Sequence, residues 1–297
     1  MSTDFSHLGT WNPGTELACF DAAALPAAVA RVREPLHVVR EGPRGRLGAA
    51  FGGQVAPNGT GYPLLGTLPA LYPEWLGDRS FCETHGLRFP YVVGEMARGI
   101  TTARMVIAMA RAGMMGFFGA GGLSPAQVGT ALDEIEAALG KDGPSWGANL
   151  IHSPHNPELE NLIADIFLSR GVRRICVSAF MGLTPAVVRC AAAGLRRDPE
   201  GRIQRRHHIF AKLSRPEVAE AFMSPAPAAL LEPLVREGKL GAEEAALAAH
   251  VPVAEDITAE ADSGGHTDNR PLATLVPALL ALRDRLLQLH RFPRPIR

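Results

Sequence analysis

The sequence predicts an α/β protein whose parallel strands form either a (β/α)8 barrel of the TIM type or an open doubly wound sheet. From about residue 85, short apolar runs alternate with segments of i, i+3, i+4 apolar spacing. This alternation occurs six times, and β-α units in series form parallel sheets with right-handed crossovers. Small and polar residues end the apolar runs. Ligands of parallel sheets bind at the carboxyl ends of the strands, and glycine there lets the backbone approach a ligand closely. These endings favour the barrel, here with about six β-α units.

The first 80 residues predict a small accessory domain. Residues 36–41 and 46–51 flank the turn sequence GPRG and predict a β-hairpin. Residues 59–78 are rich in Pro, Gly and aromatic residues, which indicates a linker. We therefore expect an accessory domain and linker over 1–80 and the barrel over 81–297.

The six predicted strands lie in the runs 89–99, 114–122, 146–153, 173–180, 207–215 and 253–266. Thr101 is expected to cap the first following helix and Gly113 to end it. Ser124 and Pro125 form an N-cap and N1 pair for the second helix. Residues 216–250 predict a helical insertion, because they are longer than a simple crossover needs.

Composition excludes several classes of function. Thirty basic residues balance thirty acidic residues, so no net charge draws the chain to nucleic acid or to an anionic membrane. No apolar stretch reaches the roughly 18 residues of a membrane span, and the start lacks a signal-peptide pattern, so we expect a cytoplasmic protein. The four cysteines form no CxxC pair, so neither a disulfide framework nor a zinc knuckle is predicted. No GxGxxG follows the first strand, which disfavours NAD binding by a Rossmann domain.

The densest polar cluster lies at residues 260–271, EADSGGHTDNRP. His266 follows a strand end there and is a candidate general acid/base or substrate-orienting donor. The alternative is a helix-capping loop, since Thr267, Asp268 and Asn269 all favour N-cap positions.

Lys212 lies at the end of an otherwise apolar run. It could offer positive charge to an anionic ligand, form a Schiff base, or extend from a strand end to solvent. Asp256, Glu260 and Asp262 share one strand face by alternation, and Lys212 on the preceding strand is their expected partner.

Asn149 is expected to make a polar contact from a strand end. His152 and His155 are spaced for a metal site but lack the accompanying HExxH or carboxylate pattern, so no metal is predicted. His207 and His208 begin a strand, where we expect them to be exposed.

The motifs FFGAGGL, NLIHSPHNP, VRRICVSAFMGLTPAVVR and SGGHTDNRP closely resemble the PfaD family, and the resemblance runs from about residue 20 to residue 297. These proteins are trans-acting, FMN-dependent enoyl reductases of polyunsaturated fatty acid and polyketide synthases. Their relatives include nitronate monooxygenases. The resemblance implies a TIM barrel with FMN that reduces 2-enoyl thioesters on acyl carrier protein with NADPH, and a possible homodimer.

The resemblance also implies roles for individual residues. Flavin contacts would come from the first-strand loop, from two polar side chains and from backbone after the sixth strand: Gly94, Met96, Ala97, Asn149, Lys212, Ser263, Gly264 and Gly265. His266 matches the active-site histidine of the nitronate monooxygenase relatives, and His266 and Lys212 are the implied catalytic residues.

The chain departs from the family pattern in two places. Glu95 stands where a small residue is expected, and we expect it to point away from the flavin or to pair with Arg98. The chain also stops at Arg297, before the family's phosphate-binding strands, so the barrel is expected to be about two units short. There are two alternative functions. One is a nitronate monooxygenase-like flavoprotein, and the other is an inactive truncated fragment or synthase-docking subunit without flavin.

Overall fold

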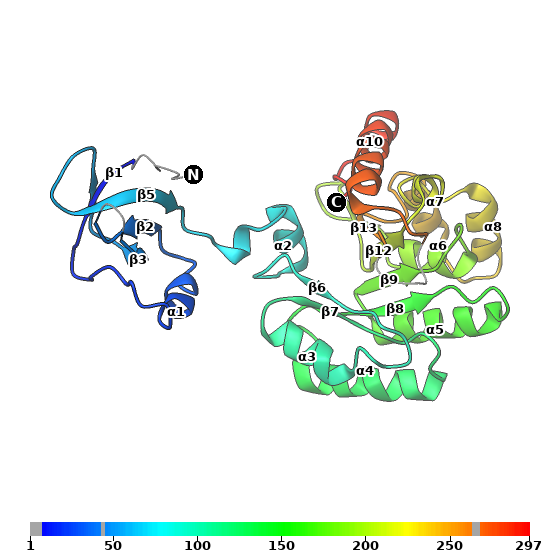
Figure 1. The fold of residues 1–297 in the computed structure, drawn as a ribbon. Coiled ribbons are helices and arrows are strands. Elements are labelled where there is room, and N and C mark those ends of the chain that lie inside the picture. The colour runs from blue at the N-terminus through cyan, green and yellow to red at the C-terminus, as the bar shows by residue number, and fades with distance from the viewer. Residues whose placement is uncertain (1–7, 43–44, 263–267) are drawn as a thin grey trace. The chain divides into compact units, whose positions relative to one another are not determined.

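The computed structural model describes residues 8–42, 45–262 and 268–297, which form two compact units, Met1–Gly77 and Asp78–Arg297 (Figure 1). Each unit has its own sheet and its own core. Among the described residues, none of the helices combines the length and the apolar character that a membrane span requires.

The first unit is built on an antiparallel five-stranded sheet with the strand order β3-β2-β5-β1-β4. Its elements are β1 (Gly9–Asn12), α1 (Leu25–Val29), β2 (Leu36–Arg40), β3 (Leu47–Phe51), β4 (Gln54–Ala56), β5 (Tyr62–Leu68) and the 3-10 turn η1 (Pro73–Trp75). The predicted hairpin is confirmed, because β2 pairs with β3 from Leu36 opposite Phe51 to Arg40 opposite Leu47.

The predicted linker over 59–78 is wrong in its first half. Residues 62–68 form β5, the central strand of this sheet. Pro63 and Gly66 are disfavoured in strands, so the sequence pattern did not indicate β5. Its Leu64 is nevertheless buried with Trp11 in the core of the unit. The indole Nε1 of Trp11 donates a hydrogen bond to the Gly52 carbonyl oxygen at 2.7 Å, so the N–H group of this buried ring has a partner.

The second unit contains a curled parallel sheet of six strands in the order β13-β12-β9-β8-β7-β6. These strands are β6 (Val92–Val93), β7 (Met115–Phe118), β8 (Gly147–Ile151), β9 (Arg174–Ser178), β12 (His208–Leu213) and β13 (Asp256–Ala259), with the hairpin β10 (Arg196–Arg197) and β11 (Ile203–Gln204) inserted between β9 and β12. Every main strand lies beside its predecessor in the sequence. A doubly wound sheet reverses its order at a switch point, so this order identifies the barrel type, as predicted.

Helices follow the strands on the outer side of the sheet (Figure 1). They are α3 (Ala103–Arg111), α4 (Pro125–Leu139), α5 (Pro157–Arg170), α6 (Pro185–Ala192), α7 (Pro216–Phe222), α8 (Ala228–Arg236), α9 (Ala242–Ala248) and α10 (Leu272–His290), and α2 (Arg79–His85) precedes the first strand. Ser124 caps α4 in a capping box with Gln127, as predicted. The α3 cap differs: Thr102 accepts from the Met105 N–H, while the expected Thr101 is buried and accepts from the Met96 N–H.

Alternation along the strands separates two apolar cores. Outward-facing residues such as Leu150, Val177 and Ala211 pack against the helices. Inward-facing residues form a second cluster of Met115, Phe117, Cys176 and Phe210. The rings of Phe117 and Phe210 lie 4.9 Å apart in an edge-to-face arrangement, so aromatic packing fills the inside of the sheet.

Gly147 makes room for this inner cluster, and its replacement by alanine is expected to lower the free energy of unfolding by about 1–3 kcal/mol. A Cβ there would lie 2.6 Å from the Arg174 carbonyl oxygen and closer still to the Phe117 ring. Gly129→Ala is the control, because a Cβ at this position of α4 meets nothing within 4 Å and favours the helix. Urea unfolding of both variants checks the prediction, and a Gly147→Ala protein as stable as Gly129→Ala would contradict it.

Candidate functional site

Five polar side chains meet at the carboxyl edge of the parallel sheet. Asn149 lies in the middle of β8, Ser178 is the last residue of β9, and Lys212 lies near the end of β12. Glu95 lies two residues after the end of β6, and Glu260 follows directly after β13. Because parallel strands end at one edge, residues far apart in the sequence become neighbours there. We call these five residues the edge cluster.

The edge cluster is a connected hydrogen-bonded chain. Lys212 Nζ lies 2.9 Å from Glu260 Oε1 and 3.5 Å from Glu95 Oε1. Glu95 Oε2 accepts from Asn149 Nδ2 at 3.4 Å, and the same amide lies 2.9 Å from Ser178 Oγ. Asn149 Nδ2 also donates to the Cys176 carbonyl oxygen at 3.2 Å, which fixes its orientation. One ammonium is thus held between two carboxylates beside an anchored amide.

Burial sets the electrostatics of the edge cluster. The side chains of Lys212, Glu95 and Glu260 are 26%, 10% and 14% exposed, so they are largely removed from water. Burial raises the pKa of Glu95, and contacts with Cys176 and Lys212 offset part of that effect. Burial opposes charge on Lys212, but the hydrogen bond to Glu260 and the charge of Glu95 prevail, so the pKa of Lys212 is raised. The ammonium therefore remains charged near neutral pH.

The loop after β6 lies next to the edge cluster and is fixed to the glycine-rich loop after β7. Arg98 N–H donates to the Gly121 carbonyl oxygen at 2.7 Å and Gly99 N–H to that of Gly119 at 2.9 Å. Gly94 has φ +142°, and a Cβ at this position would lie 2.7 Å from the Phe117 carbonyl oxygen. Beside the buried Glu95, the Met96 side chain is 48% exposed. This arrangement provides an apolar surface next to buried polar groups.

The expected pairing of Glu95 with Arg98 is wrong. Its carboxylate points into the sheet and contacts Lys212 and Asn149, and no hydrogen bond or ion pair with Arg98 occurs in the described structure. The reason is electrostatic: the buried ammonium and amide are better partners than a more exposed guanidinium. The expected pairing of Lys212 is confirmed for Glu260 only, because Asp256 binds Arg297 and Asp262 lies beyond the end of β13.

The residues of the SGGH motif cannot be placed in the site. Ser263, Gly264, Gly265 and His266 lie outside the described residues, as does Thr267. The neighbouring Asp268 does not cap α10: its carboxylate accepts from Ser214 Oγ at 2.6 Å and from Arg215 Nε at 2.9 Å. α10 begins after Pro271 without a side-chain cap.

The structure places three of the histidines considered in the sequence in structural contacts. His152 pairs with Glu160 at 2.9 Å, and Thr184 and the Ser153 N–H also donate to this carboxylate, so His152 belongs to a structural network. His207 and His208 are not exposed. His207 Nδ1 lies 2.7 Å from the Val172 carbonyl oxygen, and the His208 ring lies edge-on to that of His85 at 5.2 Å. His207 is buried and His208 is half-buried.

Sequence reasoning missed the cluster of His85, His208 and Asp256 at the amino edge of the sheet. The possible ligand atoms of these residues lie within 4.8 Å of one another, and no other such group occurs among the described residues. However, Arg297 Nε and its terminal nitrogen contact Asp256 at 2.7 and 3.1 Å, and His85 Nε2 lies 3.1 Å from the same carboxylate. Both carboxylate oxygens are therefore occupied, and the arrangement is a buried ion-pair network rather than a metal centre.

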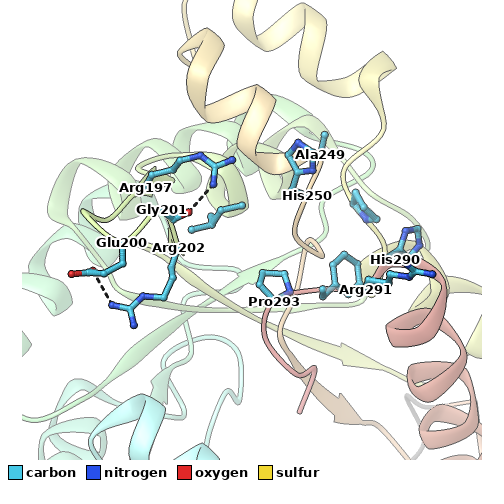
Figure 2. A pocket seen from close by; sticks show the side chains of 12 residues that line it. Arg197, Glu200, Gly201, Arg202, Ala249, His250, His290, Arg291 and Pro293 are labelled. Atoms are coloured by element: carbon cyan, nitrogen blue, oxygen red, sulfur yellow. Dashed lines mark hydrogen bonds and ion pairs between the residues drawn. The ribbon is translucent and has the colours of Figure 1, made fainter.

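One cavity lies away from the edge cluster, between the β10–β11 hairpin, the end of α9 and the segment after α10 (Figure 2). Its volume is about 450 Å³. Its arginines serve local structure: Arg197 donates to the Gly201 carbonyl oxygen at 2.7 Å, and Arg202 contacts Glu200 at 3.0 Å (Figure 2). The cavity brings together none of the predicted site residues.

No protein-family model matches the chain. The chain is 50% identical over 222 residues to a polyunsaturated fatty acid synthase component of Thraustochytrium sp., and the match covers 75% of this chain and 15% of that protein. It is 42% identical over 224 residues to polyketide biosynthesis protein PksE of Bacillus subtilis, covering 75% of this chain and 29% of PksE. The chain thus spans less than a third of the curated relatives it matches.

A solved structure is also similar to this chain. The enoyl reductase domain of MlnA, from the macrolactin biosynthesis cluster of Bacillus amyloliquefaciens, superimposes with a TM-score of 0.72 at 36% identity. The match covers 75% of this chain and 50% of the MlnA chain. It supports the barrel-type assignment that the strand order gives.

Proposed function

Because the chain belongs to one family with polyunsaturated fatty acid synthase components, polyketide biosynthesis proteins and the MlnA enoyl reductase domain, we propose that it is an FMN-dependent enoyl reductase. Its substrate would be a 2-enoyl thioester on an acyl carrier protein, its reductant NADPH, and it would act in trans on a synthase. The observation that carries the proposal is the Lys212 ammonium, held between two carboxylates at the carboxyl edge of the sheet.

The edge cluster and the adjoining loop fit a flavin. A flat, partly apolar ring system with polar edges needs an apolar face and anchored donors. The half-exposed Met96 offers an apolar side chain, and Asn149, fixed by the Cys176 carbonyl oxygen, offers an anchored amide. Gly94 and Ala97 would let backbone approach the ring. Ser263, Gly264 and Gly265 are proposed contacts on sequence grounds. When bound, FMN would supply two-electron hydride chemistry.

The site residues would stabilise negative charge on the ligand and exchange protons with the substrate. Lys212 keeps its positive charge, so it can stabilise negative charge that develops on a ligand above the sheet. Glu95 and Glu260 orient the ammonium, and Asn149 is held in one rotamer by Ser178 and Cys176. His266 is proposed to orient the substrate or to exchange a proton with it.

The first test is an absorbance spectrum of the purified chain, which is expected to show bound flavin. Addition of NADPH and a crotonyl thioester on a carrier protein or pantetheine mimic is expected to give steady NADPH oxidation. His266→Gln should lower turnover by about 10²-fold or more while flavin remains bound, whereas the exposed His155→Gln should change neither.

Two outcomes would contradict the proposal. A colourless protein that neither takes up added FMN nor oxidises NADPH would support a docking or fragment role. Oxygen uptake with an alkyl nitronate in the absence of NADPH, without enoyl reduction, would instead identify a nitronate-oxidising flavoprotein.

A further inference from the structure

A second, larger cavity lies at the amino edge of the parallel sheet, opposite the edge cluster. It is formed by the loops that precede β8, β9 and β12 and has a volume of about 1020 Å³. We call it the basic cavity, because seven of its lining residues are cationic: Lys141, Arg170, Arg173, Arg174, Arg196, Arg205 and Arg206. In the described part of the chain, Glu136 is the one acidic residue that lines it.

Three of these cations have carboxylate partners. The ion pairs are Arg170 with Asp133 and Glu136, Arg173 with Asp142, and Arg205 with Glu255. Helix dipoles account for part of the remaining positive charge, since α4 and α5 end at this edge and cations stabilise helix C-termini. Arg170 and Lys141 are explained in this way.

Neither ion pairing nor a helix dipole accounts for the positive charge of Arg174, Arg196 and Arg206. Within the described residues none of the three forms an ion pair, and they lie at the start of β9, on β10 and before β12 rather than in the last turn of a helix. The exposed Arg196 on β10 and the exposed Arg206 before β12 line the same cavity as the half-buried Arg174. Three guanidinium groups thus line one cavity without an ion-pair partner among the described residues.

The innermost groups have unused hydrogen-bonding capacity. Arg174 Nε is buried and has no hydrogen-bond partner in the described structure, while a terminal nitrogen of the same group lies 3.4 Å from the His85 carbonyl oxygen. Burial lowers the pKa of Arg174 to about 10, and the neighbouring Arg173 adds to the effect. His208 Nδ1, also at this cavity, is likewise buried without a hydrogen-bond partner. An anion bound beside Arg174 would offer its guanidinium a counter-charge and its Nε an acceptor.

We propose that the basic cavity binds a phosphorylated small molecule of nucleotide size. Phosphate oxygens accept several guanidinium hydrogen bonds at once, and arginine is the preferred residue for this geometry. The half-buried Trp146 forms part of the wall and offers an aromatic face to a base or another flat group. The site lies at the opposite edge of the sheet from the edge cluster, so its ligand is separate from the proposed reaction.

Trp146 provides the test, because it is the one tryptophan of the second unit in a chain that has three. The full chain is titrated with pyrophosphate, ADP or inorganic phosphate at constant ionic strength, with sodium chloride as the reference titration. Saturable changes in Trp146 fluorescence are expected with pyrophosphate and ADP, and Trp146→Phe should abolish the signal. Stronger binding of ADP than of pyrophosphate would indicate a nucleotide, and equal binding would indicate that the phosphates alone are recognised.

A matched pair of double variants tests the assigned residues. Arg196→Gln/Arg206→Gln removes two exposed charges from the cavity and is expected to weaken pyrophosphate binding about tenfold or more. Arg104→Gln/Arg236→Gln removes two exposed charges elsewhere and should leave the affinity within about twofold. Equal losses in both variants, or a signal that follows ionic strength without saturation, would overturn the proposal. The readout requires neither flavin nor turnover, so it is independent of the proposed reductase activity.

Discussion

Lys212→Met is expected to lower enoyl reductase turnover by about 10²–10³-fold, because it removes the one charge that the edge cluster offers to an anionic ligand. It should also destabilise the fold by about 2–3 kcal/mol, since two largely buried carboxylates lose their shared cation. Steady-state kinetics on a thioester substrate and urea unfolding measure the two effects.

The stability loss in Lys212→Met should depend on pH. The pKa of Glu95 is already raised by burial, and loss of the ammonium raises it further. A carboxyl whose pKa is higher in the folded state destabilises the fold as pH rises above its unfolded value. The variant should therefore lose more stability at pH 8 than at pH 5.

A second variant separates structure from catalysis. Lys212→Met/Glu95→Gln removes the more deeply buried of the two uncompensated acids, so it should recover part of the stability and reduce the pH dependence while remaining inactive. If the double variant regained activity, the ammonium would have no role beyond compensating Glu95.

Asp256→Asn is expected to lower the free energy of unfolding by about 3–5 kcal/mol, the largest stability effect anticipated in the chain. The side chain of Asp256 is buried, and its charge compensates the buried guanidinium of Arg297 while it also accepts from His85. Asparagine keeps the shape but leaves Arg297 without a counter-charge. Thermal and urea unfolding measure the loss, and Asp284→Asn, which affects an exposed acid beside Arg283, is the control.

The sign of the pH effect follows from the same contacts. Burial opposes ionisation of Asp256, but His85 and Arg297 prevail, and the pKa of Asp256 is lowered. A group with a lowered folded-state pKa stabilises the protein above its unfolded value, near 3.9, and loses this contribution as pH falls below it. The difference between the parent chain and Asp256→Asn should therefore be full at pH 6 and shrink below about pH 4. A difference that stays constant across this range would assign the loss to packing.

The sequence predicted what depends on local pattern. The six strands, the hairpin and the Ser124 cap follow from periodicity and capping residues within a few positions of each other. Lys212 lies near the end of β12 as predicted, whereas Asn149 lies in the middle of β8, and both contact Glu95. The resemblance to proteins of polyunsaturated fatty acid and polyketide synthesis is confirmed by the relatives.

What the sequence missed depends on partners from distant elements. Glu95 follows a glycine in a loop, and nothing near it in the chain shows that a lysine more than a hundred positions later will bind it. His85 lies on a helix before the first strand and belongs to no motif, so its pairing with Asp256 arises only in the folded chain. The arginines of the basic cavity come from three separate stretches of the chain, near the starts of β9, β10 and β12, and form no single run in the sequence.

The sequential strand order also bears on how the second unit folds. Each strand pairs with its predecessor, so every new βα unit can add to a sheet already formed, and no pairing must wait for a distant segment. The connection from β12 to β13, with its three helices, is about twice as long as that from β8 to β9. Since each doubling of loop length adds only about 0.6 kcal/mol of closure entropy, the inserted helices barely slow this stepwise assembly.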